Sequence, residues 1–284
     1  MNAIYRKGDV MLKEILDKVK SEGSLIHCIT NYVTANDCAN ILLACGGSPI
    51  MADDIGEVEE ITALCQGLTI NIGTLNQNSI KSMILAGKRA NMIGIPVILD
   101  PVGAGASALR TQSAYALMEE IHFSVLRGNI SELKTLYYGC GITKGVDVNQ
   151  IDKITEDNLN EVVEFAKKTS EKLGTIVVIT GPMDIVTDGK KVYVIRNGHP
   201  IMGKITGSGC MLSALVALFA AAHKDNILLA TVAAVITMGL CGEKAYEKVL
   251  QMGAGSASFR NYLIDAVFLL TGEELNGGAN YEIR

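Results

Sequence analysis

Short runs of consecutive apolar residues alternate along the chain with longer segments whose apolar residues recur every three or four positions. A strand that is apolar throughout is typical of a parallel sheet, because helices cover both of its faces. The alternation therefore predicts an α/β fold in three layers, with a mainly parallel central sheet and helices on both faces. The predicted strands are Leu25–Ile29, Pro49–Ala52, Leu68–Ile72, Pro96–Leu99, Ser124–Leu126 and Thr175–Ile179.

Helices are predicted between these strands and after the last of them. They cover residues 10–22, 33–45, 58–65, 78–91 and 111–121, a segment opening at Ile130, a segment capped by Thr155, and residues 207–222, 226–246 and 256–271. The segments Asp184–Thr187 and Lys191–Ile195 flank Asp188-Gly189, a hairpin signal that predicts antiparallel strands at one edge of the sheet. No linker, repeat or low-complexity tract interrupts the chain, so residues 1–284 are predicted to form a single domain.

The composition favours a small molecule as the partner. The net charge is −5 and basic residues do not cluster, which argues against nucleic acid. The seven cysteines are scattered without a C-x-x-C pair, and no secretion signal is found, so we expect reduced thiols in the cytoplasm. The uncharged stretch 226–242 falls short of the roughly 20 residues that span a bilayer, and we expect a buried core helix rather than a membrane contact.

The stretch Lys204–Ala222 combines a glycine-rich turn with an apolar helix. Gly207, Ser208 and Gly209 allow the backbone to turn sharply and to present several N–H groups, and an anion is favoured at the N-terminus of the helix that follows. Cys210 falls on the first turn of that helix, where the helix dipole favours a thiolate. A tight turn without a ligand is the alternative interpretation of these few residues.

Polar residues follow four of the apolar strands, at the sheet edge where α/β proteins bind ligands. They are Thr30-Asn31, Asp100, Arg127 to Glu132, and Thr180-Gly181. Each has a structural alternative: a helix cap for Thr30 or Asn31, a turn at Asp100, a surface ion pair between Arg127 and Glu132, and a loop at Thr180. Together they provide carboxylates for Mg²⁺, an arginine for phosphate and an anion cradle, the groups that phosphoryl transfer needs.

The chain resembles the hydroxyethylthiazole kinases of the ribokinase-like superfamily along nearly its whole length. The stretches that carry the resemblance are Thr30-Asn31-Tyr32-Val33-Thr34, Gly47 to Ala52, Asp100 to Gly105, Arg127 to Glu132, Ile179-Thr180-Gly181, and Asn197-Gly198-His199-Pro200 through Cys210. The resemblance implies ATP- and Mg²⁺-dependent phosphorylation of the primary hydroxyl of 4-methyl-5-(2-hydroxyethyl)thiazole in thiamine biosynthesis. It also implies a homotrimer with active sites at the subunit interfaces.

The resemblance further implies a role for each matching residue. Substrate contacts fall to Asn31, Met51 and Gly207; ATP contacts to Arg127, Thr180 and Asn129; Mg²⁺ and its waters to Asp100 and Glu132; and the transferring phosphoryl group to the backbone of Gly207, Ser208, Gly209 and Cys210. The adenine pocket is expected to consist of apolar side chains from the C-terminal helices.

Cys210 stands where most ribokinase-like enzymes have an aspartate base. Phosphoryl transfer through a loose transition state needs little early proton removal, so the thiol is either a weak base or a spacer. Two alternative functions stay open at this stage. One is a different ribokinase-like activity, either a hydroxymethylpyrimidine kinase or an ATP-dependent hydrate-repair enzyme; the other is a nucleotide-binding regulator without turnover, against which the presence of both Asp100 and Glu132 argues.

Overall fold

The strands of the protein form one continuous sheet in a computed structural model. The structure describes residues 12–139 and 154–284. The sheet has nine strands in the order β2-β1-β3-β4-β5-β6-β7-β8-β9 within these residues. Strands β1 to β6 are parallel, and β7, β8 and β9 add antiparallel pairs at one edge. The strands are β1 Leu25–Ile29, β2 Ser48–Ile50, β3 Gly67–Asn71, β4 Val97–Asp100, β5 Val125–Asn129, β6 Ile176–Thr180, β7 Asp184–Thr187, β8 Val192–Ile195 and β9 Tyr281–Ile283.

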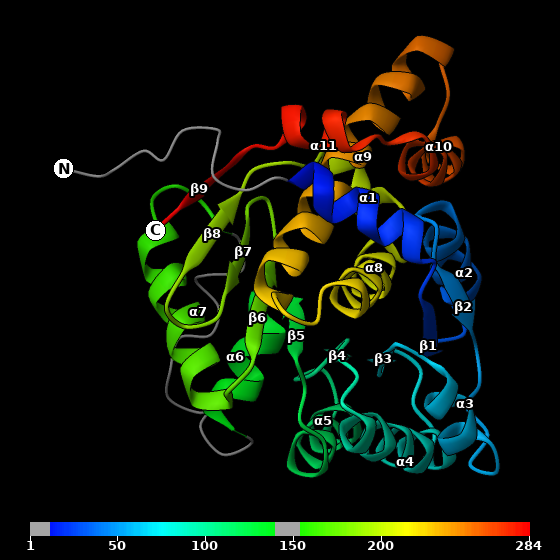
Figure 1. Cartoon of the computed structure of the whole chain (residues 1–284). Helices are drawn as coiled ribbons and strands as arrows, with labels where there is room; N and C mark the ends of the chain where they lie inside the picture. The colour runs from blue at the N-terminus through cyan, green and yellow to red at the C-terminus, as the bar shows by residue number, and fades with distance from the viewer. Residues whose placement is uncertain (1–11, 140–153) are drawn as a thin grey trace.

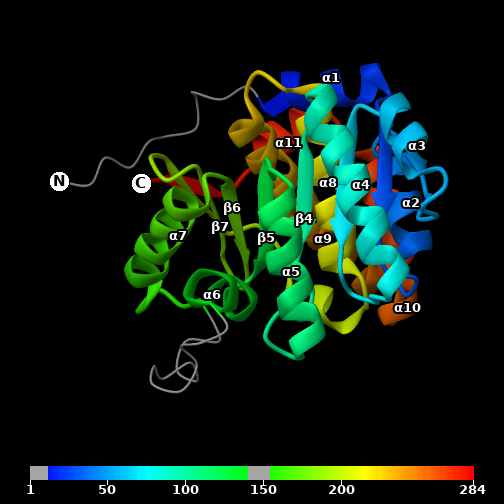
Figure 2. The same ribbon diagram turned by 90° about the horizontal axis from the view of Figure 1, so that it is seen from below.

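Helices cover both faces of this sheet, as the two views in Figures 1 and 2 show. One layer holds α1, α2, α8, α9, α10 and α11, and the opposite layer holds α3 to α7. The helices are α1 Leu12–Glu22, α2 Ala35–Ala44, α3 Val58–Leu64, α4 Gln77–Ile93, α5 Ala108–Glu120, α6 Ile130–Tyr138, α7 Leu159–Leu173, the 3₁₀ turn η1 Pro200–Lys204, α8 Ser208–Ala222, α9 Ile227–Met252, α10 Ser256–Leu269 and α11 Gly272–Gly278. The predicted three-layer α/β fold with an antiparallel edge is confirmed.

Each strand contributes side chains to two separate cores. In β4, Ile98 belongs to the core beneath α8, whereas Val97 and Leu99 belong to the core beneath α4 and α5. All three are fully buried, because successive side chains of a strand point to opposite faces and both faces are covered. The continuous apolar runs of the sequence are the result of this double burial.

The helices α8 and α9 are apolar because they lie inside the molecule. Every residue of α8 from Met211 to Ala222 is buried. By length and composition alone, helix α9 could cross a membrane. However, 72% of its most apolar 18-residue stretch is buried inside the protein. A helix that is apolar all round belongs in a core, so the expectation of a buried core helix is confirmed.

Several boundaries differ from the predictions. The predicted strand Ser124–Leu126 continues to Asn129 as β5, so that Arg127 and Asn129 lie within the strand rather than after it; they pair there with Val178 and Thr180 of β6. Thr155 is not a helix cap, because α7 begins later and has Asn158 at its N-cap position. The side chain of Asn158 reaches back and accepts a hydrogen bond from the Thr155 N–H.

The sequence pattern did not predict α11 and β9 at the C-terminal end. Strand β9 is only three residues long and pairs antiparallel with β8, where Glu282 lies opposite Val194. Such a short edge strand has no hydrophobic period of its own. Its position depends on the pairing partner that the rest of the fold provides.

The first residue of β7, Asp184, has its carboxylate in an unfavourable environment. Asp184 accepts a hydrogen bond from the Gly181 N–H at 3.0 Å. Burial nevertheless raises the pKa of Asp184 to about 7, although the Gly181 N–H and the charge of Arg127 both oppose the rise. The folded chain therefore holds a proton on Asp184 at pH values where the unfolded chain has lost it, with an unfolded pKa of about 3.9.

Replacing Asp184 by asparagine should stabilise the protein in a pH-dependent way. Wild-type stability falls as pH rises from about 4 to 7, because the unfolded state releases this proton first. Asp184→Asn keeps the acceptor for Gly181 and removes the charge, so its advantage over wild type should grow across that range to on the order of 2 kcal/mol and then level off. The difference between the two pKa values sets an upper limit of roughly 4 kcal/mol on this advantage, and the smaller figure allows for the partial exposure of Asp184. Urea unfolding at pH 4.5, 6 and 8 measures it. Asp188→Asn, an exposed turn carboxylate, is the control, and an equal gain in both variants contradicts the prediction.

Candidate active site

The carboxyl ends of the central parallel strands meet around one buried carboxylate. Asp100, the last residue of β4, is completely buried. Its Oδ2 accepts hydrogen bonds from Asn71 Nδ2 and from Ser213 Oγ, both at 2.8 Å, and its Oδ1 lies 3.5 Å from Arg127 Nη1. Burial raises the pKa of Asp100, while the charge of Arg127 and these donors oppose the rise. Four elements, β3, β4, β5 and α8, are thus joined at one point.

Two asparagine side chains connect this carboxylate to the thiol of Cys210. Asn31 and Asn71 each donate an N–H to Cys210 Sγ, at 3.3 and 3.2 Å, and Asn31 also donates to Asn71 Oδ1 at 2.9 Å. Both side chains are buried. Asn31 Oδ1 accepts the backbone N–H and the hydroxyl of Thr34, the N-cap residue of α2, so Asn31 orders the chain just before this helix and also contacts the thiol. The structure thus brings Asn31, which follows β1, next to Cys210 in the first turn of α8.

The N-terminus of α8 begins at the predicted glycine-rich turn. Gly207 is the N-cap residue and has φ +87°, a left-handed conformation that L side chains rarely adopt. Gly209 faces the guanidinium of Arg127, and a Cβ at this position would lie only 2.5 Å from Arg127 Nη1. The absence of side chains allows the arginine to lie directly against the first turn of the helix, where free N–H groups and the helix dipole favour an anion.

Arg127 has the surroundings of an anion-binding group. Its Nη2 donates to Thr180 Oγ1 at 2.8 Å, and its side chain is only 13% exposed. Its Nε is buried without a hydrogen-bond partner in the described residues. A buried donor without a partner is costly, and a phosphate oxygen would satisfy it. The alternative of a surface ion pair between Arg127 and Glu132 is wrong, because the ionic contact of Arg127 is with Asp100.

Glu132 has a structural role in addition to its charge. Its two carboxylate oxygens accept the N–H groups of Gly103 and Asn129 at 2.9 and 2.8 Å, and Asn129 Oδ1 accepts the Glu132 N–H in return. This capping box starts α6 and attaches the loop after β4 to it. Burial raises the pKa of Glu132, and the nearby charge of Asp100 adds to the rise.

The donor set suits a magnesium ion that binds mainly through water and phosphate. No group of three or more potential metal-binding side chains occurs among the described residues. Asp100 and Glu132 lie close enough for their charges to interact, and each carboxylate keeps lone pairs beyond the hydrogen bonds it accepts. Magnesium is commonly bound by one or two carboxylates together with waters and substrate phosphates, so these residues fit the ion.

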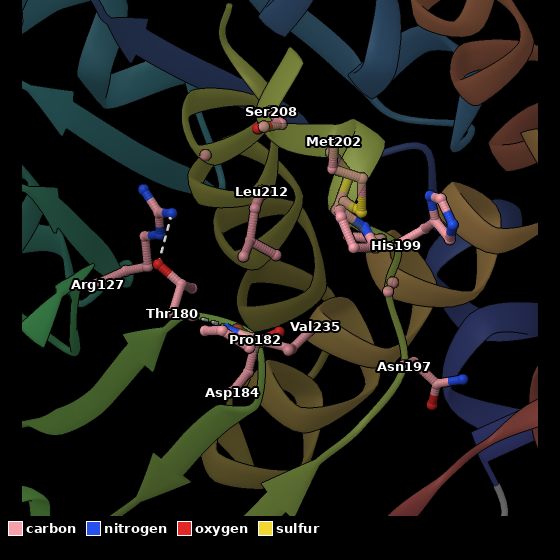
Figure 3. Close-up of a pocket in the computed structure, with 17 residues that line it drawn as sticks. Arg127, Thr180, Pro182, Asp184, Asn197, His199, Met202, Ser208, Leu212 and Val235 are labelled. Carbon is pink, nitrogen blue, oxygen red and sulfur yellow. Dashed lines mark hydrogen bonds between the residues drawn. The ribbon is translucent and has the colours of Figure 1, made fainter. Parts of the chain in front are cut away.

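A cavity of about 400 Å³ opens beside the N-terminus of α8. Arg127, Thr180, Ser208 and Gly209 line one end of it. Leu212 of α8 and Val235 and Met238 of α9 also line it, and these are apolar side chains from the C-terminal helices. Figure 3 shows Arg127 and Thr180 on one side of this cavity and Asn197, His199 and Met202 on the other.

Met51 follows the edge strand β2 and is 40% exposed. It does not line this cavity, and neither do the other residues predicted near the substrate hydroxyl, Asn31, Gly207 and Cys210. The sequence analysis in turn overlooked Asn71, which hydrogen-bonds to Asp100, Cys210 and Asn31. A signal was present, since Asn71 is an amide near the end of a mostly apolar predicted strand and a buried amide there needs partners.

Comparison with known proteins identifies the family. The sequence model of the hydroxyethylthiazole kinase family matches residues 16–273. The chain belongs to this family. It is 59% identical to the hydroxyethylthiazole kinase of Clostridium acetobutylicum over 272 residues, which cover 96% of this chain and 99% of that protein. A solved hydroxyethylthiazole kinase structure from Pyrococcus horikoshii superposes with a TM-score of 0.85 at 34% identity, covering 96% of this chain and 98% of that one.

More distant structures share the fold alone. A ribokinase-like superfamily protein from Enterococcus faecalis superposes with a TM-score of 0.58 at 14% identity, covering 93% of this chain and 100% of that one. The predicted ribokinase-like architecture and membership of the hydroxyethylthiazole kinase family are both confirmed.

Loss of the Asn71 amide should destabilise the protein markedly. Asn71→Ala removes donors to a buried carboxylate and to the thiol, and buried hydrogen bonds to charged groups are worth about 1.5–3 kcal/mol. We expect a loss of about 2–3 kcal/mol in the free energy of unfolding, measured by urea titration. Asn78→Ala, at an exposed position in the first turn of α4, is the matched control and should change stability by less than about 0.5 kcal/mol.

Proposed function

We propose that the chain transfers the γ-phosphoryl group of ATP to the primary hydroxyl of 4-methyl-5-(2-hydroxyethyl)thiazole, a step of thiamine biosynthesis. The observation that carries the proposal is Arg127, whose guanidinium lies against Gly209 in the first turn of α8 and whose Nε has no partner among the described residues, in a protein of the hydroxyethylthiazole kinase family. The single domain 1–284 is proposed to act in the cytoplasm, on small molecules rather than on nucleic acid or membranes.

Catalysis rests mainly on positioning and charge. Charge spreads over the oxygens of the phosphoryl group as it transfers, and preorganised donors that face those oxygens stabilise it. Arg127 and Thr180 are proposed to bind the phosphates of ATP, with Asn129 beside them. The N–H groups from Gly207 to Cys210 are proposed to hold the phosphoryl group during transfer. Arg127 is held in place before substrate arrives by its contacts with Asp100 and Thr180.

Asp100 and Glu132 are proposed to hold Mg²⁺ and its waters. The ion would neutralise phosphate charge and screen the two carboxylates from the phosphates of ATP. Burial has raised the pKa of both carboxyls, and a neighbouring cation favours their charged form.

The thiazole alcohol is proposed to bind beside Cys210, with contacts from Asn31, Gly207 and Met51. The sulfur of Cys210 accepts two amide N–H groups, which hold it in place. Cys210 is proposed to act either as a weak base for the substrate hydroxyl or as a spacer. Since the transition state of phosphoryl transfer is loose, the proton can leave late and a strong base is unnecessary.

Active sites at the interfaces of a homotrimer are part of the proposal. Tyr32 and Val33 follow Asn31 directly and are 82% and 55% exposed, and Met51 on the neighbouring edge strand is 40% exposed. Large apolar side chains beside a substrate site are typical of a surface that a partner covers. A second subunit seated there would enclose the thiazole.

The activity is tested by incubating the purified chain with Mg-ATP and the thiazole alcohol and following ADP and the phosphate ester by mass spectrometry. Parallel reactions contain hydroxymethylpyrimidine, or omit the metal. Formation of the thiazole phosphate with Mg²⁺ supports the proposal. Phosphorylation of the pyrimidine alone, or no ADP in any reaction, contradicts it.

A methyl group at position 209 should impair use of ATP without harming the fold. Gly209→Ala places a Cβ within 2.6 Å of both terminal nitrogens of Arg127, so the guanidinium has to move. We expect KM for ATP to rise by roughly tenfold, which corresponds to the loss of about one charge-assisted hydrogen bond. Thermal stability should fall only modestly, because the helix propensity of alanine offsets part of what the displaced guanidinium loses at Asp100 and Thr180.

Gly277→Ala is the control for that substitution, since a Cβ there meets nothing within 4 Å. Steady-state kinetics and thermal unfolding of both variants make the comparison. Unchanged ATP kinetics in Gly209→Ala would remove the contact between Arg127 and this turn from the nucleotide site.

A further inference from the structure

The loop between β8 and η1 forms the wall of the cavity opposite Arg127. Asn197, Gly198 and His199 line the cavity from this loop, and Met202 lines it from η1. The His199 ring stacks on Tyr246 of α9, with ring centroids 3.6 Å apart and an interplanar angle of 17°. This wall is therefore partly aromatic, and its position sets the width of the cavity.

A set of hydrogen bonds holds this loop to α9. Glu243 Oε1 accepts the Gly198 N–H at 2.7 Å and Asn197 Nδ2 at 3.2 Å. Among the described residues Glu243 forms no salt bridge, so N–H groups of the loop are the partners of its charge. Hydrogen bonds to a charged acceptor are stronger than neutral ones.

The C-terminal segment holds the same loop from the other side. Asn197 Nδ2 donates to the carbonyl of Gly278 at 3.0 Å, and Asn197 Oδ1 accepts the Asn280 N–H at 2.8 Å. The Arg196 N–H donates to the carbonyl of Asn280 at 2.8 Å. Asn197 is only 6% exposed, and it joins three segments that are distant in the sequence.

Close packing against α9 makes the loop position specific. A Cβ at Gly239 would lie 2.7 Å from the backbone of Asn197, and one at Gly242 would lie 2.5 Å from Met202 Sδ. Gly198 has φ +132°, which a residue with a side chain rarely adopts. The two helix glycines let the loop approach, and Glu243, one residue further along α9, accepts its N–H groups.

We propose that Asn197, Gly198 and Glu243 form a positioning lock, tied to the C-terminal segment, that fixes the His199–Met202 wall and thereby determines affinity for the nucleotide. None of the three is proposed to take part in the chemistry of phosphoryl transfer. The lock rests on the proposed function, because the cavity is taken as the ATP site. Its loss therefore changes nucleotide binding selectively, whereas thiazole binding and the rate of transfer at saturation persist.

The experiment compares three substitutions in α9 of the full-length protein. Glu243→Ala removes the acceptor, Glu243→Gln keeps one oxygen for Gly198, and Glu247→Ala changes an exposed glutamate one turn further along the helix. For Glu243→Ala we expect KM for ATP to rise about tenfold, with kcat and KM for the thiazole alcohol within about twofold of wild type. Glu243→Gln should restore KM for ATP to within about threefold, and Glu247→Ala should match wild type.

Titration with a fluorescent ATP analogue separates the lock from the proposed function. Wild type that binds no ATP overturns both. Wild type that binds ATP, together with an unchanged KM for ATP in Glu243→Ala, overturns the lock alone. If Glu243→Ala raises both KM values and lowers kcat to a similar extent, the lock is also overturned, because such a pattern indicates general damage to the fold. If Glu243→Ala does not fold, Glu243→Asp replaces it: the carboxylate is one methylene too short for Gly198, and a selective rise in KM for ATP is again required.

Discussion

The rest of the site depends on the complete burial of one carboxylate, Asp100. A buried charge is tolerated only when hydrogen bonds and an opposite charge surround it. For Asp100 they come from Asn71 on β3, Arg127 on β5 and Ser213 on α8. Because all three have to reach the same two oxygens, the relative positions of β3, β4, β5 and α8 are fixed together. That arrangement places the N-terminus of α8 at the carboxyl ends of the strands.

The same arrangement explains why the site suits both a phosphate and a cation. Arg127 and the N–H groups of α8 provide positive potential on one side. Asp100 and Glu132 provide two buried carboxylates on the other, and burial raises the pKa of each. Arg127 offsets part of the charge of Asp100. In the proposed function, a magnesium ion bound with the nucleotide would offset the remaining repulsion between these carboxylates and the phosphates.

Glycines determine the close contacts on both walls of the cavity. Gly209 allows Arg127 to lie against the first turn of α8, and Gly239 allows the backbone of Asn197 to lie against α9. The contact of Gly209 with Arg127 lies at the end of the cavity proposed for the phosphates, and the contact of Gly239 with Asn197 lies at the opposite wall. In both cases a methyl group would overlap atoms of the neighbouring segment, so the shape of the cavity depends on the absence of two side chains.

The layers, the parallel sheet and the glycine-rich start of α8 could be predicted from the sequence, because hydrophobic period, glycine and helix-start signals are local. Strands Leu25–Ile29 and Asp184–Thr187 were predicted to the residue. Only the tertiary structure decided which polar groups meet. Asn71 and Glu243 reach partners through strand order and helix packing, which join segments distant in the chain, and no local pattern records such pairings. Strand β9 exists for the same reason, since it is ordered by its neighbour rather than by its own residues.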